Sequence, residues 1–135
     1  MDISKALAIS ARGMDAQSTR LRVIAENLAN ADTTGSTPGA DAYRRKTITF
    51  ADRMDSALGE ETVRVKSIDR DKSDLPLKYD PSHPAANADG YVKMPNVNSF
   101  TELMDMREAE RSYSANLNVM QVTRGMLSRT IEMLK

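Results

Sequence analysis

The sequence predicts a mainly α fold, in which long N- and C-terminal helices form an antiparallel coiled-coil hairpin with a small irregular β insert between them. Near both ends of the chain, apolar residues recur at alternating spacings of three and four, which is typical of helices that pack along a seam. All 5 prolines lie between these two patterns. We therefore divide the chain into a first helix at 1–31, an insert at 32–98 and a second helix at 99–135.

The first helix is predicted from a seam that starts at position 3 and keeps the heptad spacing to position 31. Ser10 and Gln17 interrupt the seam, but its other members are apolar. The residues that we expect to face a partner helix or a neighbouring subunit are Ile3, Leu7, Met14, Leu21, Ile24 and Leu28.

The segment "ENLANADTTGSTPG", Glu26–Gly39, is interpreted as the exit from this helix. Residues 32–34 are short polar side chains that can bond to nearby backbone groups. Gly35 is expected to permit a positive φ, and Pro38 prevents the helix from continuing. Because no strand precedes the glycines and no lysine follows them, the segment is not predicted to be a phosphate-binding loop.

The insert is predicted to form a small antiparallel β unit. Its strands are recognised by period-two alternation, by β-branched and aromatic residues, and by the turns that separate them. The predicted strands are Tyr43–Phe50, Thr62–Ile68, Leu75–Tyr79 and Tyr91–Met94. The predicted turns are Asp80–Pro84 and Asn87–Gly90.

The second helix repeats the seam of the first. Ser99 and Glu102 have the spacing of a capping box, which predicts where this helix begins. The predicted interface residues are Leu103, Met106, Tyr113, Leu117, Met120, Leu127, Ile131 and Leu134. Both helices carry more apolar surface than one seam uses, so we expect lateral association with helices of other chains. Folding is then expected to be coupled to assembly.

Composition excludes several classes of protein. Lys and Arg number 19, Asp and Glu also number 19, and the isoelectric point is about 6.6, so no broad attraction to nucleic acid is expected. The chain has no cysteine, which excludes disulfides, and no apolar run long enough to span a membrane. Its first 20 residues do not have the pattern of a cleaved secretion signal.

No catalytic, cofactor-binding or metal-binding residue is predicted, and the chain is not expected to be an enzyme. Asp69–Asp80 superficially resembles a calcium loop, but Asp74 occupies the position that needs glycine. His83 is the only histidine and is interpreted as a turn residue. The basic segment Tyr43–Lys46 has two readings that both stay open: a charged strand edge, or a contact with an acidic neighbouring subunit.

The segment "NLANADTTG" matches a known pattern. It fits the N-x-A-N-x-x-T-x-G signature found near the end of the first helix in bacterial flagellar rod and hook axial proteins. The matching positions are Asn27, Ala29, Asn30, Thr33 and Gly35. The segments "YRRKTITF", "YDPSHP" and "GYVKMPNVN" follow in order. Along essentially its full length the chain therefore resembles the proximal rod proteins of the FlgC type. Ser36 stands where hook and distal rod members usually carry an aromatic residue, which favours the proximal rod family over them.

The resemblance implies a structural subunit of the basal-body proximal rod, a hollow shaft that crosses the periplasm, transmits torque and encloses the export channel. It implies type III export without a cleaved signal peptide. The implied partners are copies of the chain, other proximal rod proteins, the adaptor between rod and membrane ring, and the flagellar export apparatus.

A second function accounts for the helices alone. A cytoplasmic helical-hairpin adaptor or chaperone of a secretion system would share the two seams. Such a protein would not need the ordered series of motifs in the insert. The order of these motifs therefore favours the rod subunit.

Overall fold

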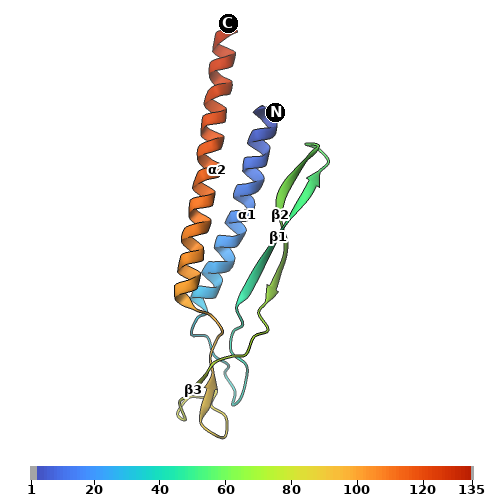
Figure 1. Ribbon diagram of the computed structural model, residues 1–135. Helices are drawn as coiled ribbons and strands as arrows, with labels where there is room; N and C mark the ends of the chain where they lie inside the picture. The colour runs from blue at the N-terminus through green and yellow to red at the C-terminus, as the bar shows by residue number, and fades with distance from the viewer. Residues whose placement is uncertain (1–2, 135) are drawn as a thin grey trace. The chain divides into compact units, whose positions relative to one another are not determined.

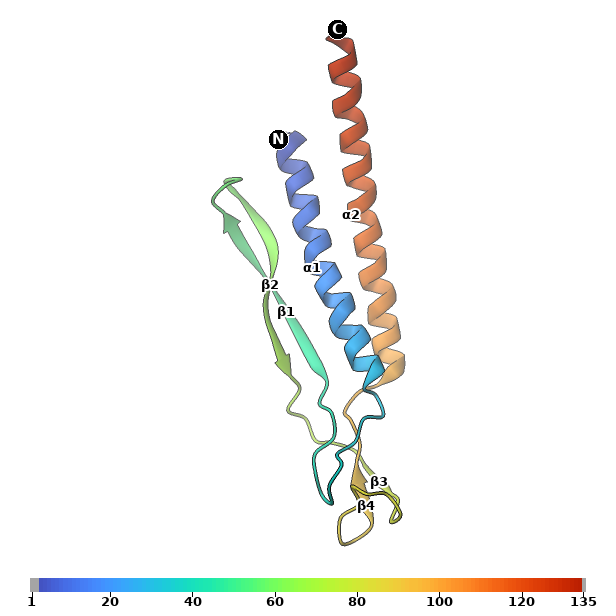
Figure 2. The ribbon, with the colours of Figure 1, turned by 180° about the vertical axis from the view of Figure 1, so that it is seen from behind.

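A computed structural model describes residues 3–134 of the chain (Figures 1 and 2). Two long helices enclose four strands in sequence. The elements are α1 (Ile3–Ala29), β1 (Lys46–Asp55), β2 (Glu60–Arg70), β3 (Leu77–Tyr79), β4 (Tyr91–Lys93) and α2 (Ser99–Met133). The strands form two separate two-stranded antiparallel sheets, β1 with β2 and β3 with β4.

The predicted fold class is wrong. Two long helices are present, but two antiparallel sheets accompany them, and the coiled-coil hairpin is matched only in part. The larger sheet has strands of 10 and 11 residues, so it is more than a small irregular insert. Sequence pattern missed its length because residues 51–55 do not alternate in period two. A tight turn directly after Asp55 instead joins β1 to β2 and keeps them paired to their ends. The backbone N–H groups of Leu58 and Gly59 donate to the carbonyl of Asp55, and Gly59 has a φ of 66°.

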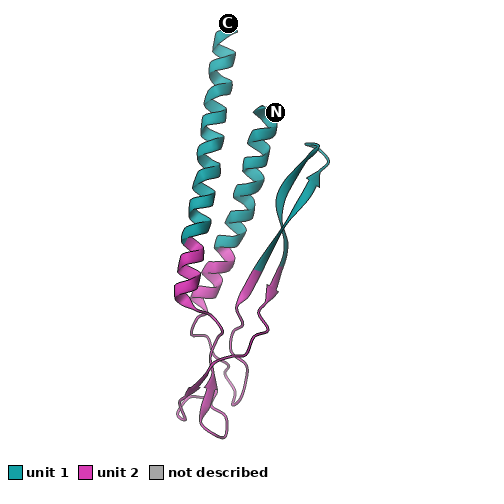
Figure 3. Cartoon of the chain, in the orientation of Figure 1, with its two compact units in different colours: residues 1–21, 48–67, 107–135 teal, residues 22–47, 68–106 magenta. Residues whose placement is uncertain are grey.

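The chain divides into two compact units (Figure 3). Unit 1 contains residues 1–21, 48–67 and 107–135, and unit 2 contains residues 22–47 and 68–106. The boundaries cut across α1, α2 and the larger sheet, so each unit draws its core from distant parts of the sequence.

In unit 1, α1 runs antiparallel to α2. Gly13 lies so close to Asn116 that an added Cβ would be 2.8 Å from Asn116 Nδ2. Arg20 follows Gly13 by seven residues, and its Nη2 lies 3.5 Å from Oε2 of Glu108, which precedes Asn116 by eight residues. The two contacts therefore run in opposite directions along the helices. This register places the start of α1 level with about Met126, so the last turns of α2 extend beyond α1 (Figures 1 and 2).

The helices of unit 1 meet mainly through small side chains. Ser10, Gly13 and Ala16 are buried on α1, and Ala109 is fully buried on α2. Small side chains let two helix backbones approach closely, but they bury little apolar area. Much of the apolar surface of α2 therefore stays exposed. Its exposed large apolar residues in this unit are Leu117, Val119, Val122, Met126, Leu127, Ile131, Met133 and Leu134.

Unit 2 contains the short sheet. Val92 points into the unit and is 1% exposed, while the neighbouring Tyr91 lies on the outer face opposite Tyr79. The two tyrosine rings meet edge to face with centroids 5.3 Å apart. The turn before β4 forms as expected, because Asn87 Oδ1 accepts from two backbone N–H groups and Gly90 has a φ of 83°.

The predicted capping box at the start of α2 is wrong. Asn98 caps this helix, because its Oδ1 accepts from the backbone N–H groups of Phe100 and Thr101 at 3.0 and 3.2 Å. The Glu102 side chain does not reach back to the cap and is instead fully buried. Its carboxylate is used in the polar cluster described next.

A candidate assembly site built on a buried polar junction

Asn27 joins three segments of unit 2 through its side chain. Oδ1 accepts from the backbone N–H of Lys46 at 2.8 Å and from the Tyr43 hydroxyl at 2.9 Å. Nδ2 donates to the Lys46 carbonyl at 2.9 Å and to Glu102 Oε2 at 3.2 Å. An amide has two N–H donors and two acceptor sites, so this buried side chain is fully satisfied. It pairs with the Lys46 backbone as a neighbouring strand would.

Glu102 is the second centre of the cluster. Its side chain has no exposed surface, and the carboxylate accepts from Asn27 and from Nε of Arg45. Arg45 Nη2 also lies 3.5 Å from a carboxylate oxygen of Asp105. A buried carboxylate is costly unless it is paired and hydrogen-bonded, and here it is both.

The backbone of Arg45 extends the cluster to the segment after β2. Its N–H donates to Asn96 Oδ1 at 2.7 Å, and its carbonyl accepts from Asp71 N at 2.8 Å. Asn96 Nδ2 then donates to Ser73 Oγ at 3.0 Å. We call the cluster of Asn27, Tyr43, Arg45, Asn96 and Glu102 the polar junction. It brings together the end of α1, the segment before β1 and the start of α2.

The other motif residues shape the exit from α1. Asn30 Nδ2 donates to the Glu26 carbonyl at 2.8 Å, and the Thr33 hydroxyl donates to Asn30 Oδ1 at 3.1 Å, so these side chains bond to the last turn of the helix. An added Cβ on Gly35 would lie 2.5 Å from the Cβ of Ala40. Gly35 has no positive φ, so the predicted reason for it is wrong: close packing requires it. Nothing in the structure explains Ala29, which is exposed.

The cations of the basic segment 43–46 find partners within unit 2. Arg45 pairs with Glu102, and Arg44 Nη1 donates to the Ser73 carbonyl at 2.9 Å. Lys46 Nζ lies 2.6 Å from Glu26 Oε2. This hydrogen bond lowers the pKa of Glu26 below its ordinary value. An acidic neighbouring subunit is therefore not needed to explain these charges.

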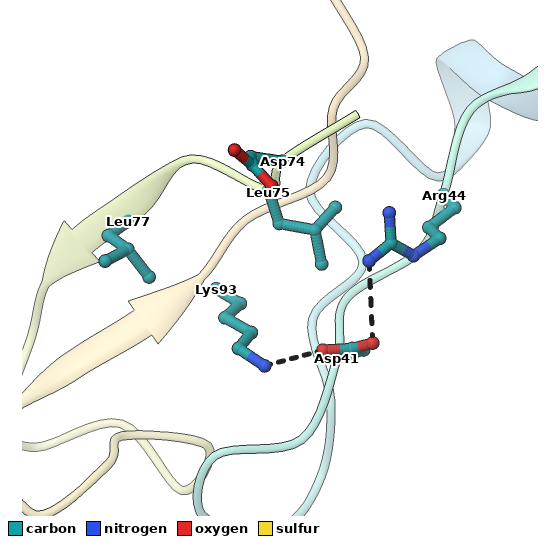
Figure 4. Close-up of a pocket in the computed structure, with 6 residues that line it drawn as sticks. All are labelled: Asp41, Arg44, Asp74, Leu75, Leu77 and Lys93. Carbon is teal, nitrogen blue, oxygen red and sulfur yellow. Dashed lines mark hydrogen bonds and ion pairs between the residues drawn. The ribbon is translucent and has the colours of Figure 1, made fainter. Parts of the chain in front are cut away.

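A hollow of about 410 Å³ lies elsewhere in unit 2 (Figure 4). Asp41 lies between two cations there, 2.7 Å from Lys93 Nζ and 3.7 Å from Arg44 Nη2, with Leu75 and Leu77 alongside. The hydrogen bond from Lys93 lowers the pKa of Asp41. A carboxylate stabilised in this way is a weak base, so the arrangement does not favour proton-transfer chemistry.

The histidine and the predicted turn carboxylates serve local structure. His83 Nδ1 accepts from Ala85 N at 3.0 Å, and Nε2 lies 3.4 Å from the Thr34 hydroxyl. Asp71 Oδ1 accepts from Ser73 N at 2.8 Å, which lowers the pKa of Asp71. Within residues 3–134, no group of three or more His, Asp or Glu side chains is placed to hold a metal ion.

A second buried carboxylate organises unit 1. Asp55 Oδ2 accepts from Arg64 Nη2 at 2.8 Å and from Arg12 Nη2 at 3.3 Å, which connects the tip of the hairpin to α1. Asp55 Oδ1 accepts from Ala57 N at 3.1 Å, and this backbone bond is the main reason that the pKa of Asp55 is lowered. Sequence reasoning missed Asp55 and gave Glu102 a different role, because the partners of both carboxylates come from distant segments.

The predicted interface residues differ in burial. In α1, Ile24 is buried, and the others, Ile3, Leu7, Met14, Leu21 and Leu28, are half-buried. In α2, the half-buried ones are Met106, Tyr113 and Met120. The exposed ones are Leu103, Leu117, Leu127, Ile131 and Leu134. Their role in an interface stays a prediction. Some of the exposed α2 residues lie away from the inner face of α2, which Glu102, Ala109 and Asn116 occupy. Others lie beyond the start of α1, so α1 does not reach them.

Comparison with known proteins gives matches at both ends of the chain. The family described as "Flagella basal body rod protein" matches residues 7–37, and the family described as "Flagellar basal body rod FlgEFG protein C-terminal" matches residues 88–133. The first match contains the signature positions Asn27–Gly35, and the second contains the start of α2. No described helix is both long enough and apolar enough to cross a membrane.

Full-length relatives are also similar. The flagellar basal-body rod protein FlgC of Agrobacterium fabrum is 53% identical over 133 residues, which covers 98% of this chain and 96% of that protein. FlgC of Bacillus subtilis is 38% identical, with 96% of both chains covered. FlgC of Salmonella typhimurium is 40% identical, with 91% of both chains covered.

Proposed function

Because this chain belongs to the FlgC family of flagellar basal-body rod proteins, we propose that its unshared apolar surface and its polar junction serve assembly of the rod. The chain is a structural subunit of the proximal rod in the flagellar basal body. The match over nearly the whole chain at 53% identity carries this conclusion. The relatives described above are all rod proteins, so nothing favours a cytoplasmic adaptor or chaperone.

The exposed apolar residues of α2 support assembly through the helices. Met126 and Ile131 are 58% and 51% exposed, and the register of unit 1 leaves Ile131 beyond the start of α1. Side chains of this kind gain free energy when a neighbouring subunit covers them. The proposed interface therefore includes the exposed α2 residues as well as the seam of α1.

The polar junction has a different role in this proposal. Its hydrogen bonds are directional, and a shift of α1 against α2 by one residue would break the bond between Asn27 and Glu102. Buried polar groups are best known for setting register in helix pairs. We propose that the junction sets the register in which each subunit presents its helices to its neighbours.

Membership of the family supports the finer details that we propose for the function. The subunits build a hollow shaft that transmits torque and encloses the export channel. Their partners are copies of this chain, other proximal rod proteins, the adaptor to the membrane ring, and the type III export apparatus. A catalytic role is not part of the proposal.

Recovery of tagged chains in purified basal bodies tests the proposal. Ile131→Asp places an unpaired charge where a subunit interface is proposed, so the variant should be missing from basal bodies and motility should be lost. Ser128→Asp, on the same exposed part of α2, is the matched control and should be incorporated. Normal incorporation of Ile131→Asp would contradict the proposed interface. Absence of the unmodified chain from basal bodies would contradict the function itself.

A further inference from the structure

A trough runs along α1 in unit 1, on the side of the helix that faces the β1–β2 hairpin. Two adjoining hollows of about 260 and 220 Å³ form it, and both are lined by Arg12 and Asp15. We define the trough by Ala8, Ala11, Asp15 and Thr19 of α1 together with Leu58 and Val63 of the hairpin. Small side chains on the helix and apolar ones on the hairpin leave room for the side chains of another helix.

The same unit carries a helix face that no described residue covers. In Figures 1 and 2, α1 lies between the hairpin and α2, so one side of α2 faces away from both. Arg111, Val122, Gly125 and Arg129 share this side by helical spacing, and we call it the outer face of α2. Val122 and the adjacent Met126 are both 58% exposed and flank Gly125 in a hollow of about 350 Å³.

Gly125 is unexplained by the chain itself. A glycine inside a helix weakens it relative to alanine, and an added Cβ at Gly125 would meet nothing within 4 Å. A glycine flanked by exposed apolar residues leaves a notch into which a second backbone can approach closely. This contrasts with Gly13, where Asn116 already fills the space.

The two surfaces also carry opposite unpaired charges. Within residues 3–134, the Asp15 carboxylate at the centre of the trough has no ion pair, whereas Arg12 and Arg64, which also line the trough, are both paired with Asp55. Arg111 and Arg129 on the outer face of α2 likewise have no ion pair within that part of the chain. The chain as a whole has equal numbers of acidic and basic residues, so the attraction comes from these local charges. An anion on the trough and cations on the outer face of α2 favour contact between two copies.

We propose that the trough of one subunit receives the outer face of α2 from a second copy of the same chain. The two surfaces lie on different sides of the unit, so each subunit can use both at once. Contacts between two different surfaces continue from copy to copy, which gives rings or open helical arrays. The inference rests on the proposed function, because a rod subunit must have neighbours, and it adds which surfaces meet.

Site-specific cross-linking tests the proposal, because the chain has no cysteine of its own. Ala11→Cys in the trough and Val122→Cys on the outer face are made in separate chains and mixed under mild oxidation. The mixture should give a disulfide-linked dimer at least tenfold faster than the same mixture with Ser82→Cys in place of Ala11→Cys. Ser82 is exposed and belongs to unit 2, so it is the matched control. Equal rates for Ala11→Cys and Ser82→Cys would overturn the proposal.

Charge reversal gives a second measurement. Asp15→Arg in the trough copy, or Arg129→Asp in the α2 copy, should slow cross-linking several-fold, and combining the two should restore the rate. Lack of restoration would contradict the pairing of these surfaces. The same cysteine pairs are also tested in purified basal bodies. Chains that enter basal bodies without cross-linking would overturn this inference and leave the proposed function intact.

Discussion

The two compact units differ in how their helices are joined. In unit 2, the buried side chains of Asn27 and Glu102 are surrounded by partners from the same chain, so the polar junction is complete in a single subunit. In unit 1, the helices meet through small residues such as Gly13 and Ala109, and the apolar side chains of α2 are exposed. The junction therefore fixes how the two helices meet in unit 2, whereas the helix contact of unit 1 leaves the apolar side of α2 exposed. Unit 2 also exposes apolar side chains, such as Tyr79 and Phe100.

The largest effect is expected from breaking the junction in unit 2. Arg45→Ala leaves the Glu102 carboxylate buried without its cation, which should lower the free energy of unfolding by about 3–5 kcal/mol. Urea unfolding of the purified chain measures this. Arg111→Ala, which removes an exposed arginine from unit 1, should change stability by less than about 0.5 kcal/mol. A similar small change for Arg45→Ala would show that the buried pair does not stabilise unit 2.

The glycines of the two units should respond in opposite directions. Gly35→Ala forces a Cβ to within 2.5 Å of the Ala40 side chain, so a loss of about 1–3 kcal/mol is expected from overpacking. Gly125→Ala meets no atom of the chain and should stabilise the isolated subunit by about 1 kcal/mol, because alanine favours helix. Thermal unfolding by circular dichroism gives both changes. Destabilisation by Gly125→Ala would show that the glycine serves the single chain after all.

The smallest effect is a dependence on pH in unit 2. Folding lowers the pKa of Asp41 from its ordinary value of 3.8, chiefly through the hydrogen bond from Lys93. A lowered pKa stabilises the folded state above the unfolded pKa, and this stability is lost as pH falls through the folded pKa. Stability should therefore decline below about pH 4. Lys93→Met should flatten that decline, whereas Lys72→Met, at an exposed position of the same unit, should leave it unchanged in urea titrations at several pH values.

Sequence pattern predicts the parts of this molecule that depend on neighbouring residues in the chain. The helices, the short strands and the turn at Asn87 follow from periodicity and turn chemistry. The polar junction does not, because Asn27 and Glu102 are 75 residues apart and nothing local predicts that they meet. The fold class was wrong because the length of the β1–β2 sheet was missed: residues 51–55 do not alternate in period two, so the sequence pattern did not predict that they pair. Periodicity also shows that α2 has an apolar stripe, but not that Leu117 and Ile131 stay exposed.

The helix-exit motif shows the same limit on a smaller scale. Its role as the end of α1 was predictable from short polar residues and proline. The reason for Gly35 was not, because the contact with Ala40 depends on the path of the chain after the helix, and Asn27 acts through the backbone of Lys46. The same residues thus match a family signature, end a helix and position the segment before β1.

The unequal ends of the two helices have a consequence for assembly. Because α2 continues past the start of α1, the two helices of unit 1 do not end at the same level. When helix ends are offset along an axis, no single cross-section passes through all of them. In a rod assembled through these helices, as proposed above, the ends of α1 and α2 would be spread along the rod axis and not gathered at one level.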